Sequence, residues 1–366
     1  MNGAGKHRPS GRRLAQIRTT LVNWGTLLAV IVAVIGYRHI EAVRARAPLP
    51  PPPARLTSAQ VEEWSSFPRY HDVVPVLLYH AIGGPKDYLS VPQPLFAAQM
   101  RALHLGHFHA IDIATYVRWV EEEMQLPPNP ILITFDDGEI SSFRGADSIL
   151  AEYGFKATMF VVPAWVQTHP TWALQWDELR AMQASGRWDI QEHAGAGHTH
   201  VPIDDNGDQG EFYAYRRWIG RTASAPAHQE TFAAYERRVR NDVLDGMSQL
   251  RAHIPGYRSL AFAVPYSNYG QRATNDERIA SFFLSMLHQH FPVVFDGDYL
   301  DTGSGRPDEI KARFSPMLSY RIQQGPVMTA DQLFCRLHAY VTHAPRSAEY
   351  ACANHVTADE GQGPGG

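Results

Sequence analysis

Two adjacent carboxylates, Asp136 and Asp137, follow a short apolar stretch and precede Gly138. The stretch 131–135 comes directly after Pro130 and predicts a strand buried on both faces. A carboxylate at the end of such a strand needs a cation or hydrogen bonds, because removing its charge from water costs several kcal/mol. The pair suggests a metal ligand beside a general base, although a strand-to-helix turn with one aspartate as N-cap fits the same local pattern.

Two histidines supply the other ligands that such a metal site would need. A second short strand is predicted at 188–192, and His193 and His198 follow it, separated only by alanine and glycine. Without bulky residues between them, both rings can turn toward one point. With Asp137 they give two nitrogens and one oxygen and leave a coordination position open, as in a catalytic zinc site. His200 is an alternative for either histidine ligand.

At these positions the chain resembles the polysaccharide deacetylases, the NodB-homology or carbohydrate esterase family 4 enzymes. The segment 134–138, Thr-Phe-Asp-Asp-Gly, is similar to their first motif. The segment 193–198 is similar to their paired-histidine motif, with the wider spacing of the branch that deacetylates poly-β-1,6-N-acetylglucosamine. The opening strand of that branch is similar to 74–80, and the Pro-Tyr groove wall of the third motif to 262–266. The resemblance covers about residues 73–270.

The resemblance implies a metal-dependent N-deacetylase that acts on N-acetylglucosamine residues of an extracellular polysaccharide. A divalent metal held by Asp137, His193 and His198 would make water a stronger nucleophile, with zinc as the default and cobalt or nickel as alternatives. Asp136 would accept the proton of the attacking water. The resemblance assigns stabilisation of the oxyanion to the backbone amide of Tyr266, whose ring would also line the substrate groove.

Three positions depart from the family pattern. Ala194 stands where members usually have Ser or Thr, so a hydrogen bond that braces the histidine loop is missing. Ala263 stands where many members carry an arginine that orients the catalytic aspartate. The family's Leu-x-His motif has only a weak match that ends at His338, so the general acid is open among His338, His200, His80 and a metal-bound water. A non-catalytic carbohydrate-binding relative is therefore an alternative to an enzyme.

The pattern of the whole chain predicts an α/β fold. With 366 residues, of which 44% are apolar and 19% charged, the composition is that of a globular protein with a large core. Strand and helix patterns alternate from residue 74 to 162, which indicates parallel strands with helical crossovers. Both candidate site segments follow strands, the position of the chemistry in parallel barrels. The resemblance implies a distorted, incomplete (β/α) barrel of the NodB-homology type, with which this pattern agrees.

The N-terminus predicts attachment to a membrane. Residues 1–18 are basic and would be cytoplasmic, and residues 19–37 form an uncharged apolar stretch of 19 residues. As a helix this stretch rises about 28 Å, close to the ~30 Å thickness of the hydrocarbon core, which predicts a transmembrane signal anchor. A cleaved signal peptide is the alternative, with small residues at 45 and 47. The proline-rich segment 38–72 is expected to be a linker to an extracytoplasmic deacetylase domain at 73–345.

Other segments leave alternatives open. Cys335 and Cys352 either close a loop worth up to about 3 kcal/mol in an oxidising compartment or remain free thiols. The glycine-rich tail 346–366 is expected to be flexible. Inside the domain, the insertion 201–229 either covers the substrate as a lid or folds onto the barrel. Its aromatic and basic side chains include the cluster Tyr213, Tyr215, Arg216, Arg217 and Trp218.

The expected partner is an extracellular N-acetylglucosamine polymer, with peptidoglycan or chitin-like chains as alternative substrates. A formal net charge of −4 argues against nucleic acid, whose binding proteins carry a basic face. A glycosidase is disfavoured because its two carboxyl groups flank a bond at about 5–9 Å, whereas adjacent residues of one strand are poorly placed for that. The sequence does not identify a protein partner.

Overall fold

The computed structural model describes residues 56–84, 89–122, 124–222, 226–298, 317–325, 327–345, 347–348 and 351–352. They all belong to one compact unit, Pro50–Gly366. Among these residues no helix has both the length and the apolar character needed to span a bilayer. The expected anchor at 19–37, the basic N-terminus and most of the tail 346–366 lie outside the described residues.

Parallel strands form an eight-stranded sheet that closes on itself where β3 pairs with β1. The strands of this sheet are β1 (Val76–Tyr79), β2 (His109–Ala110), β3 (Pro130–Phe135), β4 (Ala157–Val161), β5 (Trp188–Glu192), β10 (Ala261–Ala263), β11 (Val293–Asp298) and β12 (Met317–Gln323). Among the described strands, β2 pairs only with β3, so the barrel proper runs β1-β12-β11-β10-β5-β4-β3. Strands β10 and β5 share one paired position, and β11 shifts register against β12. The expected distorted (β/α) barrel is confirmed.

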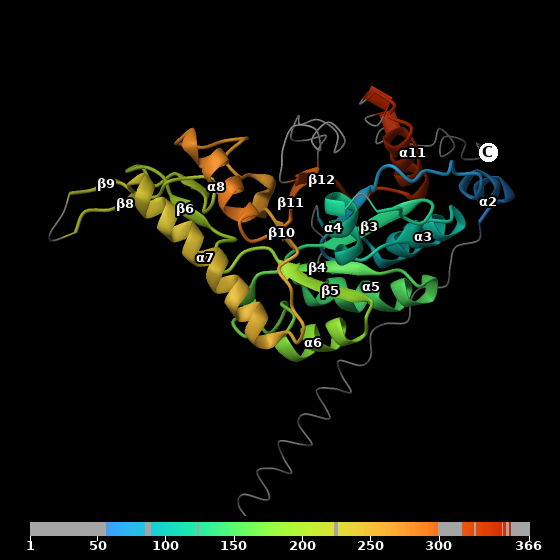
Figure 1. Cartoon of the computed structure of the whole chain (residues 1–366), viewed down its shortest axis with the longest axis horizontal. Helices are drawn as coiled ribbons and strands as arrows, with labels where there is room; N and C mark the ends of the chain where they lie inside the picture. Colours follow the sequence, from blue (N-terminus) through green and yellow to red (C-terminus); the bar gives the residue numbers. More distant parts are fainter. Residues whose placement is uncertain are drawn as a thin grey trace, which may run out of the picture. The chain divides into compact units, whose positions relative to one another are not determined.

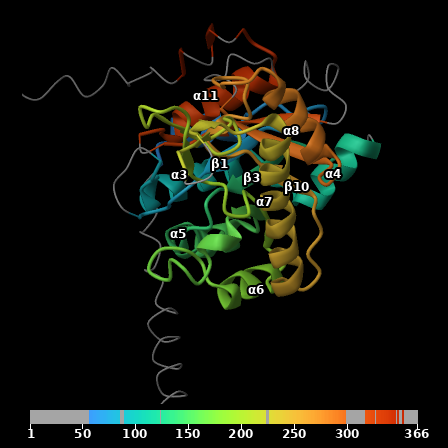
Figure 2. The ribbon, with the colours of Figure 1, turned by 90° about the vertical axis from the view of Figure 1, so that its left-hand side faces the viewer.

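Helices surround the barrel (Figures 1 and 2). Their bounds, with two short 3₁₀ turns, are α2 (Ser58–Ser65), α3 (Gln93–Leu105), α4 (Ile113–Glu122), α5 (Ile140–Tyr153), η1 (Pro163–Trp165), α6 (Trp176–Ala184), α7 (Phe232–His253), η2 (Pro265–Ser267), α8 (Arg278–His288) and α11 (Ala330–Val341). Helix α3 packs beside α5 and α11, and α7 lies against β5 and η1. The alternation of strands and helices expected from residue 74 to 162 is present, from β1 through β4.

Side chains alternate along each strand, so every second residue points into the barrel. Leu132 of β3, Phe160 of β4 and Phe295 of β11 are buried together in the interior. The odd-numbered residues of β3 belong to a larger apolar cluster beneath the helices. Asp136 continues the inward set of β3, and Arg321 lies on the inward face of β12, because the residues on either side of it belong to the outer cluster. This alternation brings both charged groups to the same end of the barrel interior.

The packed domain begins before residue 73, the boundary expected from the proline-rich composition. Helix α2 starts with a capping box at Thr57, whose side chain accepts from Gln60 while the Gln60 side chain accepts from Thr57 N–H. The Trp64 indole is buried and donates to Asp331 of α11 at 3.0 Å. Its ring packs against Phe334 with 5.7 Å between centroids. The end of the expected linker is therefore part of the fold.

Cys335 of α11 and Cys352 form a disulfide with 5.5 Å between their Cα atoms. The bond closes a loop of 17 residues and ties the start of the expected flexible tail to α11. Of the two alternatives for the cysteines, the bonded one is therefore correct.

Candidate metal centre

The expected metal ligands converge at the C-terminal ends of β3 and β5. Asp137 follows β3, and His193 and His198 follow β5. Asp137 Oδ1 lies 3.4 Å from Nε2 of each histidine. One ligand atom from each of the three residues lies within 4.8 Å of the others. The structure thus brings together one carboxylate and two imidazoles, as the sequence predicted.

Backbone and side-chain contacts aim these groups at one point. Asp137 has a left-handed backbone with φ of 71°, a conformation that an aspartate tolerates better than most residues. The His193 ring donates from Nδ1 to the Ala263 carbonyl oxygen at 2.8 Å, which leaves the Nε2 lone pair facing Asp137. The His198 ring packs between Trp165 and Tyr266, at centroid distances of 4.9 and 4.3 Å.

The donor set fits a divalent metal ion. Asp137 Oδ1 is buried and has no hydrogen-bond partner, a costly state for a carboxylate oxygen unless a cation contacts it. Burial raises the pKa of the Asp137 carboxyl, but the neighbouring histidines outweigh it and hold the pKa below its ordinary value. Burial, together with the charge of His193, lowers the pKa of His198 to about 4, so His198 is neutral and able to bind a metal at pH 7.

The general-base candidate, Asp136, is held by an arginine that sequence reasoning missed. Arg321 of β12 donates from Nη1 and Nη2 to the two carboxylate oxygens of Asp136, at 2.6 and 2.7 Å. Its Nε donates to the Asp296 carbonyl oxygen at 2.8 Å. Burial raises the pKa of Asp136, but the charges of Arg321 and His193 outweigh it, so the pKa lies below its ordinary value. Asp136 is therefore ionised and able to accept a proton, with Oδ2 3.8 Å from His193 Nε2.

Arg321 performs the orientation that the family pattern assigns to the position of Ala263. The signal in the sequence is a single basic residue within the mostly apolar segment 317–323, whose residues 318–322 are buried. A buried arginine on an inward strand position requires an acidic partner. The sequence alone does not say which of the chain's acidic residues that partner is.

A pocket of about 680 Å³ opens over the three ligands. Its lining includes Asp136, Asp137, His193, His198, His80, Leu78, Leu89, Glu211, Val264, Tyr266, Ser267, Asn268, Arg272, Ala273 and Gln323. The Tyr266 side chain is 37% exposed, and the residue has a φ of 57° in the 3₁₀ turn η2. The Pro-Tyr segment therefore forms a wall of the pocket, as the resemblance implied.

The three histidines that are candidates for the general acid differ in their positions relative to the pocket. His80 lines the pocket, and its Nδ1 is buried without a hydrogen-bond partner. His200 contacts the Tyr266 ring at 4.7 Å between centroids but is not among the residues that line the pocket. His338 is exposed on α11 and packs edge-on against Phe67. The structure thus does not bring His338 to the site, because α11 runs along the outside of the barrel.

The insertion folds onto the scaffold and does not cover the pocket with its aromatic residues. It forms two hairpins, β6 (His200–Pro202) with β7 (Gln209–Glu211) and β8 (Trp218–Ile219) with β9 (His228–Gln229). Tyr213 is buried and stacks on Phe283 of α8 at 4.7 Å. Of the insertion residues described, Glu211 is the one that lines the pocket, and it accepts from Asn268 Nδ2 at 3.2 Å.

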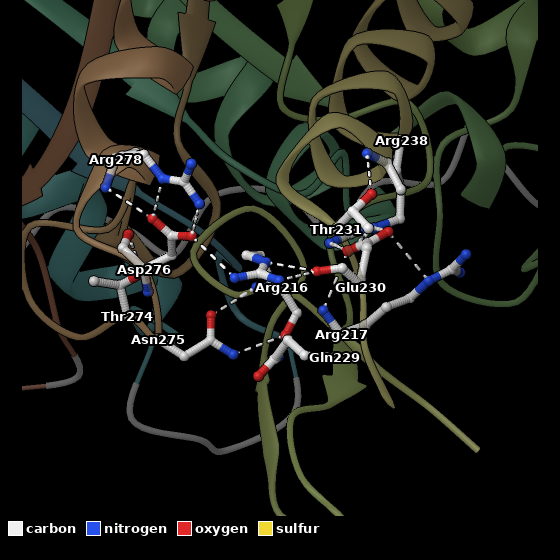
Figure 3. A network of polar contacts seen from close by, with 11 residues as sticks. Arg216, Arg217, Gln229, Glu230, Thr231, Arg238, Thr274, Asn275, Asp276 and Arg278 are labelled. Atoms are coloured by element: carbon white, nitrogen blue, oxygen red, sulfur yellow. Dashed lines mark hydrogen bonds and ion pairs between the residues drawn. The ribbon is translucent and has the colours of Figure 1, made fainter. Parts of the chain in front are cut away.

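Figure 3 shows the polar network that fixes the second hairpin. Buried Glu230 pairs with Arg238 of α7 at 2.8 Å and with Arg217 at 3.3 Å. Arg216 pairs with Asp276 at 3.1 Å, and its guanidinium also donates to the Glu230 carbonyl oxygen. Arg216 and Arg217 therefore make their contacts within the fold. Together with Arg238, this network connects α7 to the segment that follows the Pro-Tyr wall.

Comparison with known proteins agrees with this geometry. The family model described as polysaccharide deacetylase matches residues 123–281. YxkH of Bacillus subtilis (strain 168), which carries the name of a polysaccharide deacetylase, is 32% identical over 89 residues, or 24% of this chain. The match spans about a third of the length of that curated relative, 32%.

Solved structures share the barrel. A de-N-acetylase from Aggregatibacter actinomycetemcomitans superposes with a TM-score of 0.55 at 18% identity, over 70% of this chain and 95% of that one. The deacetylase domain of BpsB from Bordetella bronchiseptica gives 0.51 at 19% identity, over 68% and 94%. At these identities the likeness concerns the fold alone. The family match over residues 123–281, the barrel and the ligand set therefore agree, and all three point to the polysaccharide deacetylases, a class of carbon–nitrogen hydrolases.

Proposed function

We propose that this chain is a metal-dependent N-deacetylase that removes acetyl groups from N-acetylglucosamine residues of an extracellular polysaccharide, of the poly-β-1,6-N-acetylglucosamine type. One observation carries the proposal. A low-pKa carboxylate paired with a buried arginine, Asp136 with Arg321, stands beside the three-ligand set Asp137, His193 and His198 in an open pocket. A base next to an open metal site is what amide hydrolysis requires.

Each residue has a separate role in this mechanism. A divalent ion held by Asp137, His193 and His198 would supply Lewis acidity, which lowers the pKa of water and polarises the acetamide carbonyl. Asp136 accepts the proton of the attacking water, and Arg321 keeps its carboxylate ionised and fixed in orientation. Tyr266 lines the pocket, where its ring can pack on a sugar and its backbone amide lies in the turn that borders the ligands.

The departing amine needs a proton, and we assign its delivery to His80. Among the three histidines left open by the sequence, His80 is the one that lines the pocket. Burial lowers the pKa of His80, while Asp136 and Asp137 partly offset this effect. The protonated His80 ring is therefore a strong acid whose charge Asp136 and Asp137 stabilise, which suits transfer of a proton to an amine.

The β-1,6 linkage is supported by the five-residue step between His193 and His198 and by the opening strand at 74–80. The similar Aggregatibacter structure is named a de-N-acetylase, which supports an N-linked acetyl group as the target. Peptidoglycan or chitin-like oligomers, with β-1,4 linkages, are the alternative substrates. A non-catalytic carbohydrate-binding relative is disfavoured because Arg321 supplies the support for Asp136 that Ala263 cannot give.

We also propose that the domain works outside the cytoplasm, tethered by residues 19–37 as a single-pass anchor. The apolar length of that stretch supports the tether. The disulfide between Cys335 and Cys352 supports an oxidising compartment.

Acetate release from defined oligomers tests the function. Residues 55–356, purified and loaded with Zn²⁺, Co²⁺ or Ni²⁺, should release acetate from β-1,6-linked N-acetylglucosamine oligomers faster than from β-1,4-linked ones. Removal of the metal with a chelator should abolish release. Equal rates on both linkages would reject the β-1,6 assignment, and polymer binding without acetate would favour the non-catalytic relative.

A further inference from the structure

The loop between the two histidine ligands has no bracing side chain of its own, since Ala194 is buried and apolar. Instead, a carboxylate from another element accepts hydrogen bonds from the backbone of the loop. Asp242 of α7 accepts from Gly195 N and Gly197 N through Oδ2, at 3.0 and 3.1 Å. Its Oδ1 accepts from Ala196 N at 2.8 Å. Three successive backbone N–H groups therefore converge on one side chain.

A buried phenol completes this arrangement. The Tyr213 hydroxyl donates to Asp242 Oδ2, and the Tyr213 ring is buried against Phe283. Tyr213 itself is held by Tyr235 of α7, whose hydroxyl donates to the Tyr213 carbonyl oxygen at 2.5 Å. The carboxylate thus has four donors, and the insertion, α7 and the histidine loop meet at Asp242.

The loop also lies directly on the helix backbone. A Cβ added to Gly195 would lie 2.1 Å from the Asp242 carbonyl oxygen, and one added to Gly246 would lie 2.9 Å from Gly195 Cα. The Gly195 carbonyl oxygen accepts from Ala164 N of η1 at 3.0 Å. The backbone N–H and carbonyl oxygen of Gly195 are both hydrogen-bonded. The loop therefore has little freedom to move His198.

His198 depends on this loop more than His193 does. His193 continues strand β5, with its N–H bonded to Val161 O at 2.9 Å and its ring bonded to the Ala263 carbonyl. His198 comes after the three clamped residues, and its ring is positioned by packing against Trp165 and Tyr266. The direction of the chain into His198 is therefore set by the peptides that Asp242 binds.

We propose that Asp242, supported by Tyr213, is a positioning residue that pre-organises His198 for metal binding. The inference rests on the proposed metal-dependent function but concerns a separate quantity, the affinity of the folded protein for the ion. Outer-shell partners of this kind commonly change metal affinity by about 10–100-fold when they are removed. Neither residue is among those that line the pocket.

Zinc affinity of the metal-free full chain, measured by competition with a chromogenic chelator, tests the proposal. Asp242→Asn keeps the shape of the side chain, but its amide NH₂ is a donor and cannot accept a hydrogen bond from the backbone N–H that it faces. Zinc should therefore bind about 10–100-fold more weakly. Tyr213→Phe removes one donor and should weaken binding less. Asp245→Asn, on the exposed face of the same helix, is the matched control and should bind zinc as the unaltered chain does.

A second measurement separates positioning from simple loss of stability. With Co²⁺ in place of Zn²⁺, the visible absorption of Asp242→Asn should differ from that of Asp245→Asn, because the position of His198 changes the ligand field. Unaltered zinc affinity and an unaltered cobalt spectrum in both Asp242→Asn and Tyr213→Phe would overturn the proposal, even if the melting temperature fell. If Asp242→Asn does not fold, the zinc affinity and cobalt spectrum of Tyr213→Phe decide whether the proposal holds.

The outcome for the unaltered chain distinguishes this proposal from the proposed function. If the unaltered chain binds zinc but releases no acetate, the proposed enzymatic function is rejected and the test of Asp242 stays valid. A chain that binds no zinc would overturn both.

Discussion

Arg321 and Asp136 lie 185 positions apart in the chain and form a two-pronged ion pair at 2.6 and 2.7 Å inside the barrel. Both are almost fully buried, with side-chain exposures of 1% and 2%. The pair stands at the closure of the sheet, since β3 and β12 are both neighbours of β1. Barrel closure therefore brings Arg321 to Asp136, the proposed base.

Replacing Arg321 should impair the base more than the metal site. Arg321→Met removes the charge that holds the pKa of Asp136 down, so the pKa should rise and the acid limb of the kcat/KM profile should move to higher pH. Breaking a buried pair also costs about 3–5 kcal/mol of stability. Arg321→Lys keeps the charge and should shift the profile less. A profile of Arg321→Met that coincides with that of the unaltered chain would show that Asp136 is not the base.

Variants of Asp136 and His198 should distinguish the loss of catalysis from the loss of metal binding. Asp136→Asn removes the proton acceptor while the three ligands stay, so acetate release should fall by about 10²–10⁴-fold and zinc should remain bound. His198→Ala removes a ligand, so the zinc content after dialysis should fall with the activity. Metal analysis and acetate release on the same samples make the comparison. Normal turnover by Asp136→Asn would disprove its assignment.

His80 and His338 provide a matched pair for the general acid. His80→Gln should lower kcat strongly and leave zinc bound, because His80 lines the pocket but is not one of the three ligands. His338→Gln should keep full activity, since His338 is exposed on α11. Rates with an activated acetyl ester, whose leaving group needs no proton, should recover in His80→Gln. Equal losses of kcat in the two variants would contradict the assignment.

Titration of Asp296 should lower the free energy of unfolding as the pH rises. Burial raises the pKa of its carboxyl from 3.8 to about 7. Between about pH 4 and pH 7 the folded state therefore binds one more proton than the unfolded state, so the free energy of unfolding falls as the pH increases through this window. Asp296→Asn cannot titrate, so its melting temperature relative to the unaltered chain should be higher at pH 8 than at pH 5. A difference that does not change with pH would show that Asp296 does not titrate in this way.

The disulfide should add measurable stability. Changing Cys335 and Cys352 together to serine frees the 17-residue loop that the bond closes, which should cost about 3 kcal/mol or less. A reducing agent should lower the melting temperature of the unaltered chain and leave that of the double variant unchanged. The same melting temperature with and without reductant would indicate that the bond does not contribute.

Local sequence patterns were enough to predict most elements and the three candidate metal ligands. The apolar run before Asp136 and Asp137 predicts a buried strand, and the alternation of strands and helices places its end on the catalytic rim of a parallel barrel. His193 and His198 share a glycine-rich loop after another strand, so their proximity is nearly local. Residues 1–55, with the expected anchor, lie outside the described part of the chain, and that prediction stands untested by the structure.

Other features required the tertiary structure. Helix α2 was expected to be linker because prolines precede it, yet burial of Trp64 against α11 decides its place. The aromatic and basic residues of the insertion were compatible with a lid, and partners on α7 and α8 settled their orientation. His338 matched a motif only by residue type, and the path of α11 keeps it away from the pocket.

The sequence by itself determined the chemistry that this protein carries, because a carboxylate pair and a histidine pair at strand ends are encoded by short-range spacing. Only the tertiary structure decided which groups support that chemistry. Arg321 and Asp242 come from a strand and a helix far along the chain, and their roles depend on barrel closure and helix packing. No local sequence pattern predicts such pairings. The energy of a buried charge depends on which partner the fold brings within hydrogen-bond distance.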